Sequence, residues 1–224
     1  MLAELAGDPV DGMVCLGDAL QGGPQPAEVL DLLVGLDCPT VLGNADAFLL
    51  DAAAGEVAPT EEHLDVRAWT NDRLGPERLD RIRGFQPTIE LDLGHGHRLL
   101  GFHGSPSSYD EILVATQPYD EFRAALGELR TSVLAGGHVH QQYLRRVENS
   151  LMVNPGSIGQ SWAWDDPGVI DPWAAYAVIT TGDTGVEVAF RRVTLAVDEI
   201  VDAIERSGRP HPQQSIDGWR RIRS

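Results

Sequence analysis

In the first half of the chain, short apolar runs alternate with longer amphipathic stretches. Apolar runs at 11–16 and 39–42 predict two buried strands, and the 3.6-residue period between them predicts a helix over 26–34. A polar stretch with helical periodicity follows at 59–85, and its Gly75-Pro76 pair divides it into two helices. The first half therefore alternates strand and helix.

The second half of the chain is richer in strand patterns. Residues 88–92 and 98–102 predict a hairpin around Gly94-His95-Gly96, and residues 119–129 predict an amphipathic helix. Further strands are predicted at residues 142–147, 151–153, 174–179 and 186–192. A last helix is predicted at 197–206.

This order of elements is typical of an α/β fold with mixed sheets, because strands meet helices early and other strands late. A chain of 224 residues fits one domain with a sizeable core, which we place at residues 1–206. Beyond Ser207 the chain becomes polar and contains Pro210 and Pro212. We expect residues 207–224 to form a flexible surface tail.

The composition favours a cytoplasmic protein that does not enter a membrane. Hydrophobic residues make up 42% of the chain. No apolar run approaches the roughly 20 residues that a membrane-spanning helix needs. The N-terminus has no basic segment followed by an apolar one, so no secretory signal is visible. Cys15 and Cys38 fall within or beside predicted strands and are interpreted as reduced core residues.

The charge balance argues against binding to bulk nucleic acid. The chain has 17 basic and 34 acidic residues, a net charge of −17, and every basic residue is an arginine. A protein that grips duplex nucleic acid through its phosphates needs a basic face, whereas these arginines are scattered. A small phosphorylated substrate held by metal cations is compatible with the negative charge.

Four short apolar runs end in glycine-flanked residues that can bind a metal. They are Leu16-Gly17-Asp18, Leu42-Gly43-Asn44, Phe102-His103-Gly104 and Val133-Leu134-Ala135 followed by Gly136-Gly137-His138-Val139-His140. Open α/β sheets bind ligands outside the carboxyl ends of their strands, where each of these side chains is expected. Two cations about 3.5–4 Å apart can stabilise both the attacking and the leaving oxygen of a phosphoryl transfer. The series therefore indicates a two-metal site in which the Asp18 carboxylate bridges the cations.

This series resembles the calcineurin-like metallophosphoesterase superfamily, in particular its small bacterial and archaeal phosphodiesterase branch. The resemblance extends from Asp11 to Arg206 and includes Val153-Asn154-Pro155-Gly156-Ser157. It implies a four-layer α/β/β/α sandwich with two mixed sheets. The family's opening element, a strand that ends in Asp-x-His, is missing from this sequence, and Met1–Gly7 resembles the last turns of the helix that follows it. We therefore expect a fold that lacks its first strand.

The resemblance also implies roles for individual residues. Asp18, Asn44, His103 and His138 match the complete second metal site of the family, and His140 matches a ligand of the first site. The first site would consist of Asp18, His140 and the missing Asp and His, so it is incomplete. The implied metals are manganese, iron, zinc or nickel, and the implied catalytic residues are Asp18, Asn44 and His103.

By this resemblance the protein is a metal-dependent phosphoesterase. The implied reaction is phosphodiester hydrolysis of a small phosphorylated substrate by a metal-bound hydroxide. The family often has a histidine acid after the asparagine, whereas this chain has Ala45, as is common in the phosphodiesterase branch. One alternative is a protein phosphatase or dinucleoside tetraphosphatase of the same superfamily. The other is a non-catalytic interaction module with an incomplete metal site.

Three further features each allow two interpretations. Asp46 either orients a histidine by hydrogen bonding or is an acid at a helix N-terminus. The turn at Asn154-Pro155-Gly156-Ser157 either presents backbone N–H groups to an anion or only packs beneath the metal loop. The long loop 160–173, with tryptophans at 162, 164 and 173, is expected to line a substrate pocket or a partner surface.

The other histidines are not expected to bind metal. His95 and His97 flank a glycine in the predicted hairpin turn, and no partner for them is visible in the sequence. We interpret this segment as a solvated turn. His63 lies in a polar helix and His211 in the predicted tail, so both are expected at the surface.

Overall fold

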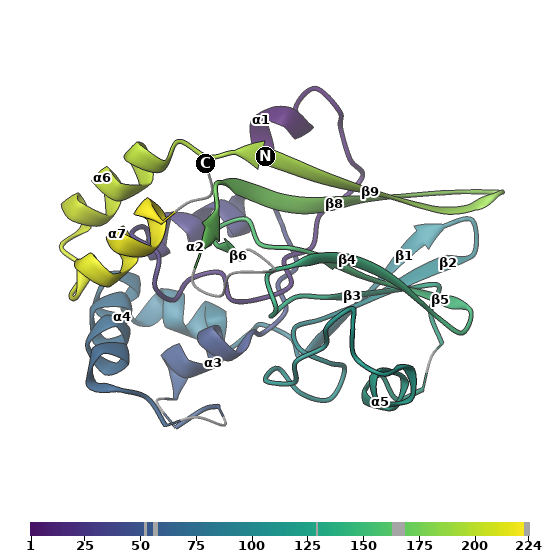
Figure 1. Cartoon of the computed structure of the whole chain (residues 1–224), viewed down its shortest axis with the longest axis horizontal. Helices are drawn as coiled ribbons and strands as arrows, with labels where there is room; N and C mark the ends of the chain where they lie inside the picture. Colours follow the sequence, from purple (N-terminus) through teal and green to yellow (C-terminus); the bar gives the residue numbers. More distant parts are fainter. Residues whose placement is uncertain (52, 56–57, 129, 163–168, 222–224) are drawn as a thin grey trace.

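The computed structural model describes residues 1–51, 53–55, 58–128, 130–162 and 169–221. It has the α/β fold that the sequence predicts, with a five-stranded mixed sheet, a two-stranded antiparallel sheet and helices around them (Figure 1). The larger sheet has the strand order β1 (Thr88–Gly94), β2 (His97–Phe102), β3 (Val133–Gly136), β5 (Ser150–Pro155), β4 (Gln142–Val147). The smaller sheet pairs β8 (Trp173–Gly182) with β9 (Gly185–Thr194).

The three central strands of the larger sheet run parallel, which brings two loops of the candidate site together. β2 pairs with β3 so that Phe102 lies opposite Gly136, and β3 pairs with β5 in the same direction. The chain therefore leaves β2 and β3 at the same edge, where the Gly137 N–H donates to the His103 carbonyl at 2.8 Å. The outer strands β1 and β4 are antiparallel to their neighbours.

Apolar side chains cover both faces of the larger sheet. On one face, α5 (Tyr119–Ala125) contributes the fully buried Phe122 to a cluster with side chains of the sheet. On the other face, Val133 belongs to a cluster that includes side chains of β8 and β9. The short helix α1 (Leu2–Leu5) lies beyond β8 and β9, where Glu4 accepts a hydrogen bond from the Tyr176 hydroxyl (Figure 1). The layers thus follow the expected α/β/β/α order.

The first two predicted strands are shorter than expected. In place of strands over 11–16 and 39–42, the backbone forms only isolated parallel bridges, Cys15 to Thr40 and Val41 to Gln86. The ladder ends after Cys15 because the Leu16 carbonyl accepts a hydrogen bond from the His103 ring instead of from another strand. Beyond Leu16, the positive φ angles of Gly17 and Asp18 turn the chain away from the extended conformation.

Three helices pack together beside the sheets. They are α2 (Pro26–Gly35), α3 (Asn44–Leu50) and α4 (Glu61–Ile82), and they bury Leu20, Leu30, Leu49, Leu74 and Ile82 in a common cluster. The break predicted at Gly75-Pro76 is confirmed. Gly75, within α4, has a φ of 68° and interrupts the helical backbone there. The helix α3 was expected only under one interpretation of Asp46, which places that residue at a helix N-terminus.

The end of the chain differs from the flexible tail expected after Ser207. Helix α6 (Val197–Ser207) matches the prediction, but residues Pro212–Arg220 form a further helix, α7. Ile216 and Trp219 are buried in a cluster with Ile170 and two residues of α6. Residues three apart on a helix share one face, so this apolar pair is the signal that the sequence analysis missed. The boundary of the domain at residue 206 stays a prediction.

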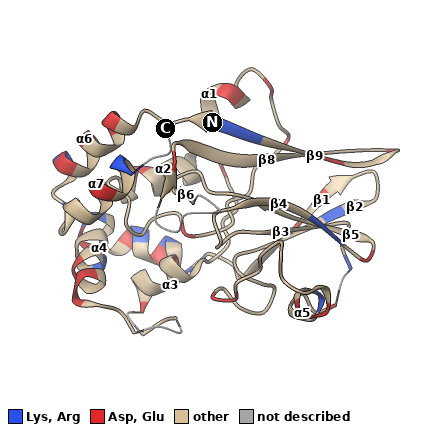
Figure 2. Ribbon diagram, in the orientation of Figure 1, with Lys and Arg blue, Asp and Glu red and all other residues tan. Residues whose placement is uncertain are grey.

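The charged residues show no large basic face in the view of Figure 2. Acidic segments recur along α4 and α6, and the basic segments are scattered among them. Several arginines form ion pairs with nearby carboxylates, for example Arg78 with Asp31 and Arg123 with Glu148. Among the described residues, no helix is long and apolar enough to cross a membrane.

The docking of α7 can be tested by replacing its buried tryptophan. We expect Trp219→Ala to lower the free energy of unfolding by about 3 kcal/mol, because it removes a large apolar side chain and leaves a cavity. Urea denaturation measures this value. The matched control is Gln214→Ala on the exposed side of the same helix, which is expected to change stability by less than about 0.5 kcal/mol. Equal effects of the two substitutions would contradict the packing of α7.

Candidate metal centre

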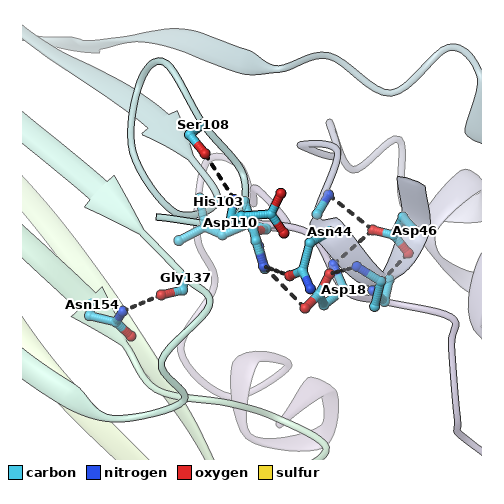
Figure 3. Close-up of polar contacts among 12 residues, drawn as sticks. Asp18, Asn44, Asp46, His103, Ser108, Asp110, Gly137 and Asn154 are labelled. Atoms are coloured by element: carbon cyan, nitrogen blue, oxygen red, sulfur yellow. Dashed lines mark hydrogen bonds and ion pairs between the residues drawn. The ribbon is translucent and has the colours of Figure 1, made fainter. Parts of the chain in front are cut away.

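Four segments that are distant in the sequence converge where the strands and bridges end (Figure 3). Asp18 follows the bridge at Cys15, and Asn44 begins α3 directly after the second bridge segment. His103 follows β2, and His138 follows β3. The sequence prediction that these side chains meet at the strand ends thus agrees with the geometry, although the structure does not test their chemical roles.

The donor atoms of these residues lie close enough to share one cation. His103 Nε2 is 3.1 Å from Asn44 Oδ1 and 3.1 Å from Asp18 Oδ2. One ligand atom each from Asp18, His103 and His138 lies within 4.8 Å of the other two. Donor atoms about 2.1 Å from a common cation are about 3 Å apart when their bonds meet at right angles. The spacing and the mixture of carboxylate, amide and imidazole therefore fit a divalent transition metal.

The second ring nitrogen of His103 fixes the orientation of the ring. Its Nδ1 lies 2.6 Å from the Leu16 carbonyl oxygen, which can only accept, so the ring donates through Nδ1–H. Nε2 is left facing Asp18 and Asn44. Hydrogen bonds of this kind set the tautomer of histidines that bind metals. The same contact joins the loop that carries Asp18 to the end of β2.

Asp18 and His103 stabilise each other in their charged forms. Burial opposes ionisation of Asp18, but the hydrogen bond and the charge of His103 outweigh it, and the pKa of Asp18 lies below its ordinary value. Burial also disfavours the charged His103 ring, yet Asp18 outweighs this effect and raises the pKa of His103. The anionic carboxylate that a metal needs is therefore maintained in this largely buried place.

His138 and His140 have the opposite tendency. Burial and the neighbouring His103 lower the pKa of His138, and burial lowers the pKa of His140. Both rings therefore favour the neutral form that binds metals. His140 makes a hydrogen bond with the backbone of Gln160 and is outside the group formed by Asp18, His103 and His138. The assignment of His140 to a first metal site stays a prediction.

Three of the predicted ligands have a left-handed backbone conformation. The φ angles are 56° for Asp18, 66° for His138 and 57° for His140. For residues other than glycine this region costs about 1 kcal/mol or more, histidine included. Such conformations persist only where the surroundings hold them, and they concentrate at functional sites. The strain therefore supports a functional role for these loops.

The contacts of Asp46 do not support the interpretation in which it orients a histidine. Its carboxylate is fully buried and accepts backbone N–H groups of Asp18, Ala19 and Gly43 at 2.7, 3.2 and 3.3 Å (Figure 3). Burial and the charge of Asp18 raise the pKa of Asp46 to about 7, while the N–H groups of Gly43 and Asp18 act against this rise. Asp46 lies in the first turn of α3, as the helix interpretation expects. The carboxylate holds a backbone loop, and not a histidine.

The turn after β5 supports the loop that carries His138. The buried Asn154 side chain donates to the Gly137 carbonyl at 2.6 Å and accepts the Gly156 N–H at 3.0 Å (Figure 3). Both the nitrogen and the oxygen of the Asn154 amide are therefore engaged in hydrogen bonds. These contacts favour the interpretation in which the turn packs beneath the metal loop.

His95 and His97 are outside the donor group found among the described residues, and each contacts a side chain that is distant in the sequence. His95 Nδ1 lies 2.8 Å from an oxygen of Asp183, and His97 Nδ1 lies 3.1 Å from the Ser132 hydroxyl. The partners are 88 and 35 residues away in the chain, so a local pattern could not indicate them.

The tryptophan-rich loop is described only in part. Residues 163–168, which include Trp164, lie outside the described residues. On either side of them, β6 (Ser161–Trp162) pairs with β7 (Ile170–Asp171). Trp173 begins β8, and its ring lies 4.7 Å from the Arg192 guanidinium. The proposed role of this loop in binding a substrate or a partner stays a prediction.

Asp110 is a residue near the site that the sequence analysis missed. It lies in the loop after His103, where its N–H donates to the Ser108 hydroxyl at 3.1 Å (Figure 3). Its negative charge acts on His138 and opposes the lowering of the pKa of that ring. The loop Gly104–Glu111 has no strand or helix pattern. The only sequence signal that could have identified Asp110 is its short distance from His103 along the chain.

A comparison with protein families gives one match that covers most of the chain. The model of the calcineurin-like phosphoesterase superfamily domain matches residues 1–184. Among solved structures, the hypothetical protein PH1004 from Pyrococcus horikoshii has a TM-score of 0.77 at 20% identity, covering 96% of this chain and 88% of that chain. A metallophosphoesterase from Sphaerobacter thermophilus has a TM-score of 0.70 at 22% identity, covering 96% and 92%. At these identities the likeness shows the fold.

Two kinds of sequence relative were found. An uncharacterized protein of Methanocaldococcus jannaschii is 24% identical over 177 residues, which are 71% of this chain and 70% of the relative. A symmetrical bis(5'-nucleosyl)-tetraphosphatase of Bordetella pertussis is 35% identical over 95 residues, which are 41% of this chain. The match spans only 33% of the length of the tetraphosphatase.

A substitution at Gly43 tests the close approach of the two N-terminal loops. A Cβ at Gly43 would lie 2.1 Å from Asp18 Oδ1 and 2.4 Å from the Asp18 nitrogen, so Asp18 must move. We expect Gly43→Ala to weaken Mn²⁺ binding by at least about 10-fold, as losses of ligand-supporting contacts do. Calorimetric titration measures the affinity. Gly35→Ala is the control, because a Cβ there meets nothing within 4 Å, and unchanged binding by both variants would contradict the geometry.

The backbone strain at His138 predicts an unusual order of stabilities. Without metal, His138→Gly is expected to be more stable than His138→Ala by about 1 kcal/mol, since only glycine adopts the left-handed conformation at little cost. At His103, which is not among the residues with positive φ, the order is expected to be reversed. Urea denaturation of the four variants checks this, and alanine exceeding glycine at both positions would refute it.

Proposed function

Because the chain belongs to the calcineurin-like phosphoesterase superfamily, a superfamily of hydrolases, we propose that it is a metal-dependent phosphodiesterase. The observation that carries the proposal is the convergence of Asp18, Asn44, His103 and His138 with donor atoms spaced for a cation. Carboxylate, amide oxygen and neutral imidazole suit manganese, iron, zinc and nickel, and we propose manganese as the metal for a first assay.

The chain's own residues hold the charges and the geometry for this reaction. When bound, divalent cations supply the positive charge that activates the attacking water and stabilises the phosphoryl oxygens. Asp18 would provide the anion that holds them, and the Asn44 amide oxygen and the His103 Nε2, once it has lost its proton to solvent, would provide donors on the same side. His103 is prevented from rotating by the Leu16 carbonyl. Since Ala45 has no acidic proton, we propose that the preferred substrates have leaving groups that need little protonation.

The distribution of positive charge favours a substrate of low charge. The chain has no lysine and a net charge of −17. Many arginines are engaged away from the centre, as Arg145 is with the carbonyl of Gln117 and Arg192 is with Gln142. The substrate charge would then be offset mainly by the cations. A singly charged diester suits such a site better than a tetraphosphate, which supports a small phosphodiester as the substrate and no bulk nucleic acid.

The two rival functions predict different results in a direct assay. A dinucleoside tetraphosphatase is supported by the Bordetella relative, but only over the matched third of that protein. A protein phosphatase would favour a phosphoserine peptide. A non-catalytic interaction module would bind metal and hydrolyse none of these substrates.

The experiment measures hydrolysis of four substrates by the Mn²⁺-loaded protein. These are bis-p-nitrophenyl phosphate, p-nitrophenyl phosphate, diadenosine tetraphosphate and a phosphoserine peptide. We expect the highest kcat/KM for the diester, and a fall of at least about 100-fold in His138→Ala, because removal of a ligand group weakens the metal. His97→Ala is the matched control and is expected to keep the wild-type rate. A preference for the tetraphosphate or the peptide would overturn the proposal, and so would inactivity on all four.

A further inference from the structure

We infer that Asp46 is a positioning residue of the metal centre, which sets the distance between Asp18 and Asn44. The inference deepens the proposed function and rests on it, since it concerns the same centre. In the inferred role, Asp46 does not contact the substrate. It acts through the backbone of the loop that carries Asp18.

The carboxylate of Asp46 connects two segments that are 28 residues apart in the sequence. Its Oδ2 accepts the Asp18 N–H at 2.7 Å and the Gly43 N–H at 3.3 Å, and its Oδ1 accepts the Ala19 N–H at 3.2 Å. Both oxygens are therefore used, and the side chain is fully buried. In its ionised form, a buried carboxylate with several N–H donors gives strong, charge-assisted hydrogen bonds.

The carboxylate of Asp18 also joins the same two segments, because it accepts a hydrogen bond from α3. Asp18 Oδ1 accepts the Ala45 N–H at 2.8 Å, so the loop of Asp18 is held from α3 and α3 is held from the loop of Asp18. The other oxygen, Asp18 Oδ2, is the one that faces His103 Nε2. The contact with Ala45 thus fixes the rotation of the carboxylate and leaves one oxygen for the centre.

This arrangement explains the left-handed backbone of Asp18. A φ of 56° directs the Asp18 N–H toward Asp46 while the Asp18 side chain faces the centre. Gly43 has no side chain, so the two segments approach to the distance at which these hydrogen bonds form. Asn44 follows Gly43 directly and begins α3, and its Oδ1 therefore depends on the same connection.

The experiment compares Asp46→Asn with the wild type in Co²⁺ binding. The amide nitrogen of asparagine cannot accept hydrogen bonds, so at least one N–H of the Asp18 loop loses its partner. We expect the Co²⁺ dissociation constant to rise by about 10- to 100-fold and the visible absorption spectrum of bound Co²⁺ to change. Thr70→Val is the matched control. It removes a fully buried hydrogen bond to Val66 in α4, away from the centre, and is expected to change neither property.

Amide exchange and a second variant cover the case in which Asp46→Asn does not fold. Nuclear magnetic resonance of the wild type is expected to show slow exchange of the Asp18 amide proton with and without Zn²⁺. Asp46→Ala introduces no opposing donor and is expected to show the same loss of Co²⁺ affinity. Rapid exchange of the Asp18 amide overturns the inference.

The outcomes separate the inference from the proposed function. Wild-type affinity and spectrum in a folded Asp46 variant overturn the inference, and so do equal losses in Thr70→Val. A wild type that binds Co²⁺ but hydrolyses none of the four substrates refutes the proposed function, and the comparison of affinities still decides the role of Asp46. A wild type that binds no Co²⁺ refutes both.

Discussion

The contact between Asp18 and His103 is the interaction on which the candidate centre depends. Asp18 is largely shielded from water, and a buried carboxylate without a partner would lose its charge or destabilise the fold. His103 provides the partner at 3.1 Å and is itself held through Nδ1 by the Leu16 carbonyl, two residues before Asp18. Backbone, ring and carboxylate thus form a closed loop of contacts. These contacts between the chain's own residues hold the donor set in place.

Glycines make this assembly possible because they let backbones approach within hydrogen-bond distance. A Cβ at Gly17 would lie 2.7 Å from the Gly43 nitrogen, and a Cβ at Gly137 would lie 3.0 Å from the Leu16 carbonyl oxygen. The loop of Asp18 therefore contacts the loops of Asn44 and His138 through backbone atoms. The side chains that follow each glycine are left free to face a common point. A glycine before the ligand is therefore a requirement of packing in three of the four motifs, those of Asp18, Asn44 and His138.

The sequence predicted the convergence of the ligand motifs better than it predicted the elements around them. Ligand motifs at strand ends are local features, and the parallel pairing of β2 with β3 brings them together as the fold class requires. The bounds of helix α3 were not predicted, because it begins at Asn44 itself, in a segment identified by its motif and not by its periodicity. The contacts of Asp46 with Asp18 and of His95 with Asp183 join residues far apart in the chain, so no pattern along the sequence could indicate them. Helix α7 had a detectable signal in Ile216 and Trp219, but Pro210 and Pro212 outweighed this signal in the prediction.

The acidic character of the chain limits what the centre can bind. With 34 acidic against 17 basic residues, the protein repels anions at long range, and a phosphorylated substrate gains nothing from electrostatic steering. Under the proposed function, association would then depend on short-range contact with bound cations. Close to the cations, their positive charge would outweigh the negative potential of the rest of the protein. Each additional negative charge on a substrate would increase its repulsion by the acidic protein. Arginines that contact other groups, such as Arg145 and Arg192, do not offset that charge. The charge pattern is thus compatible with the small, weakly charged phosphoester that we propose as the substrate, and the donor geometry is compatible with the cations that would bind it.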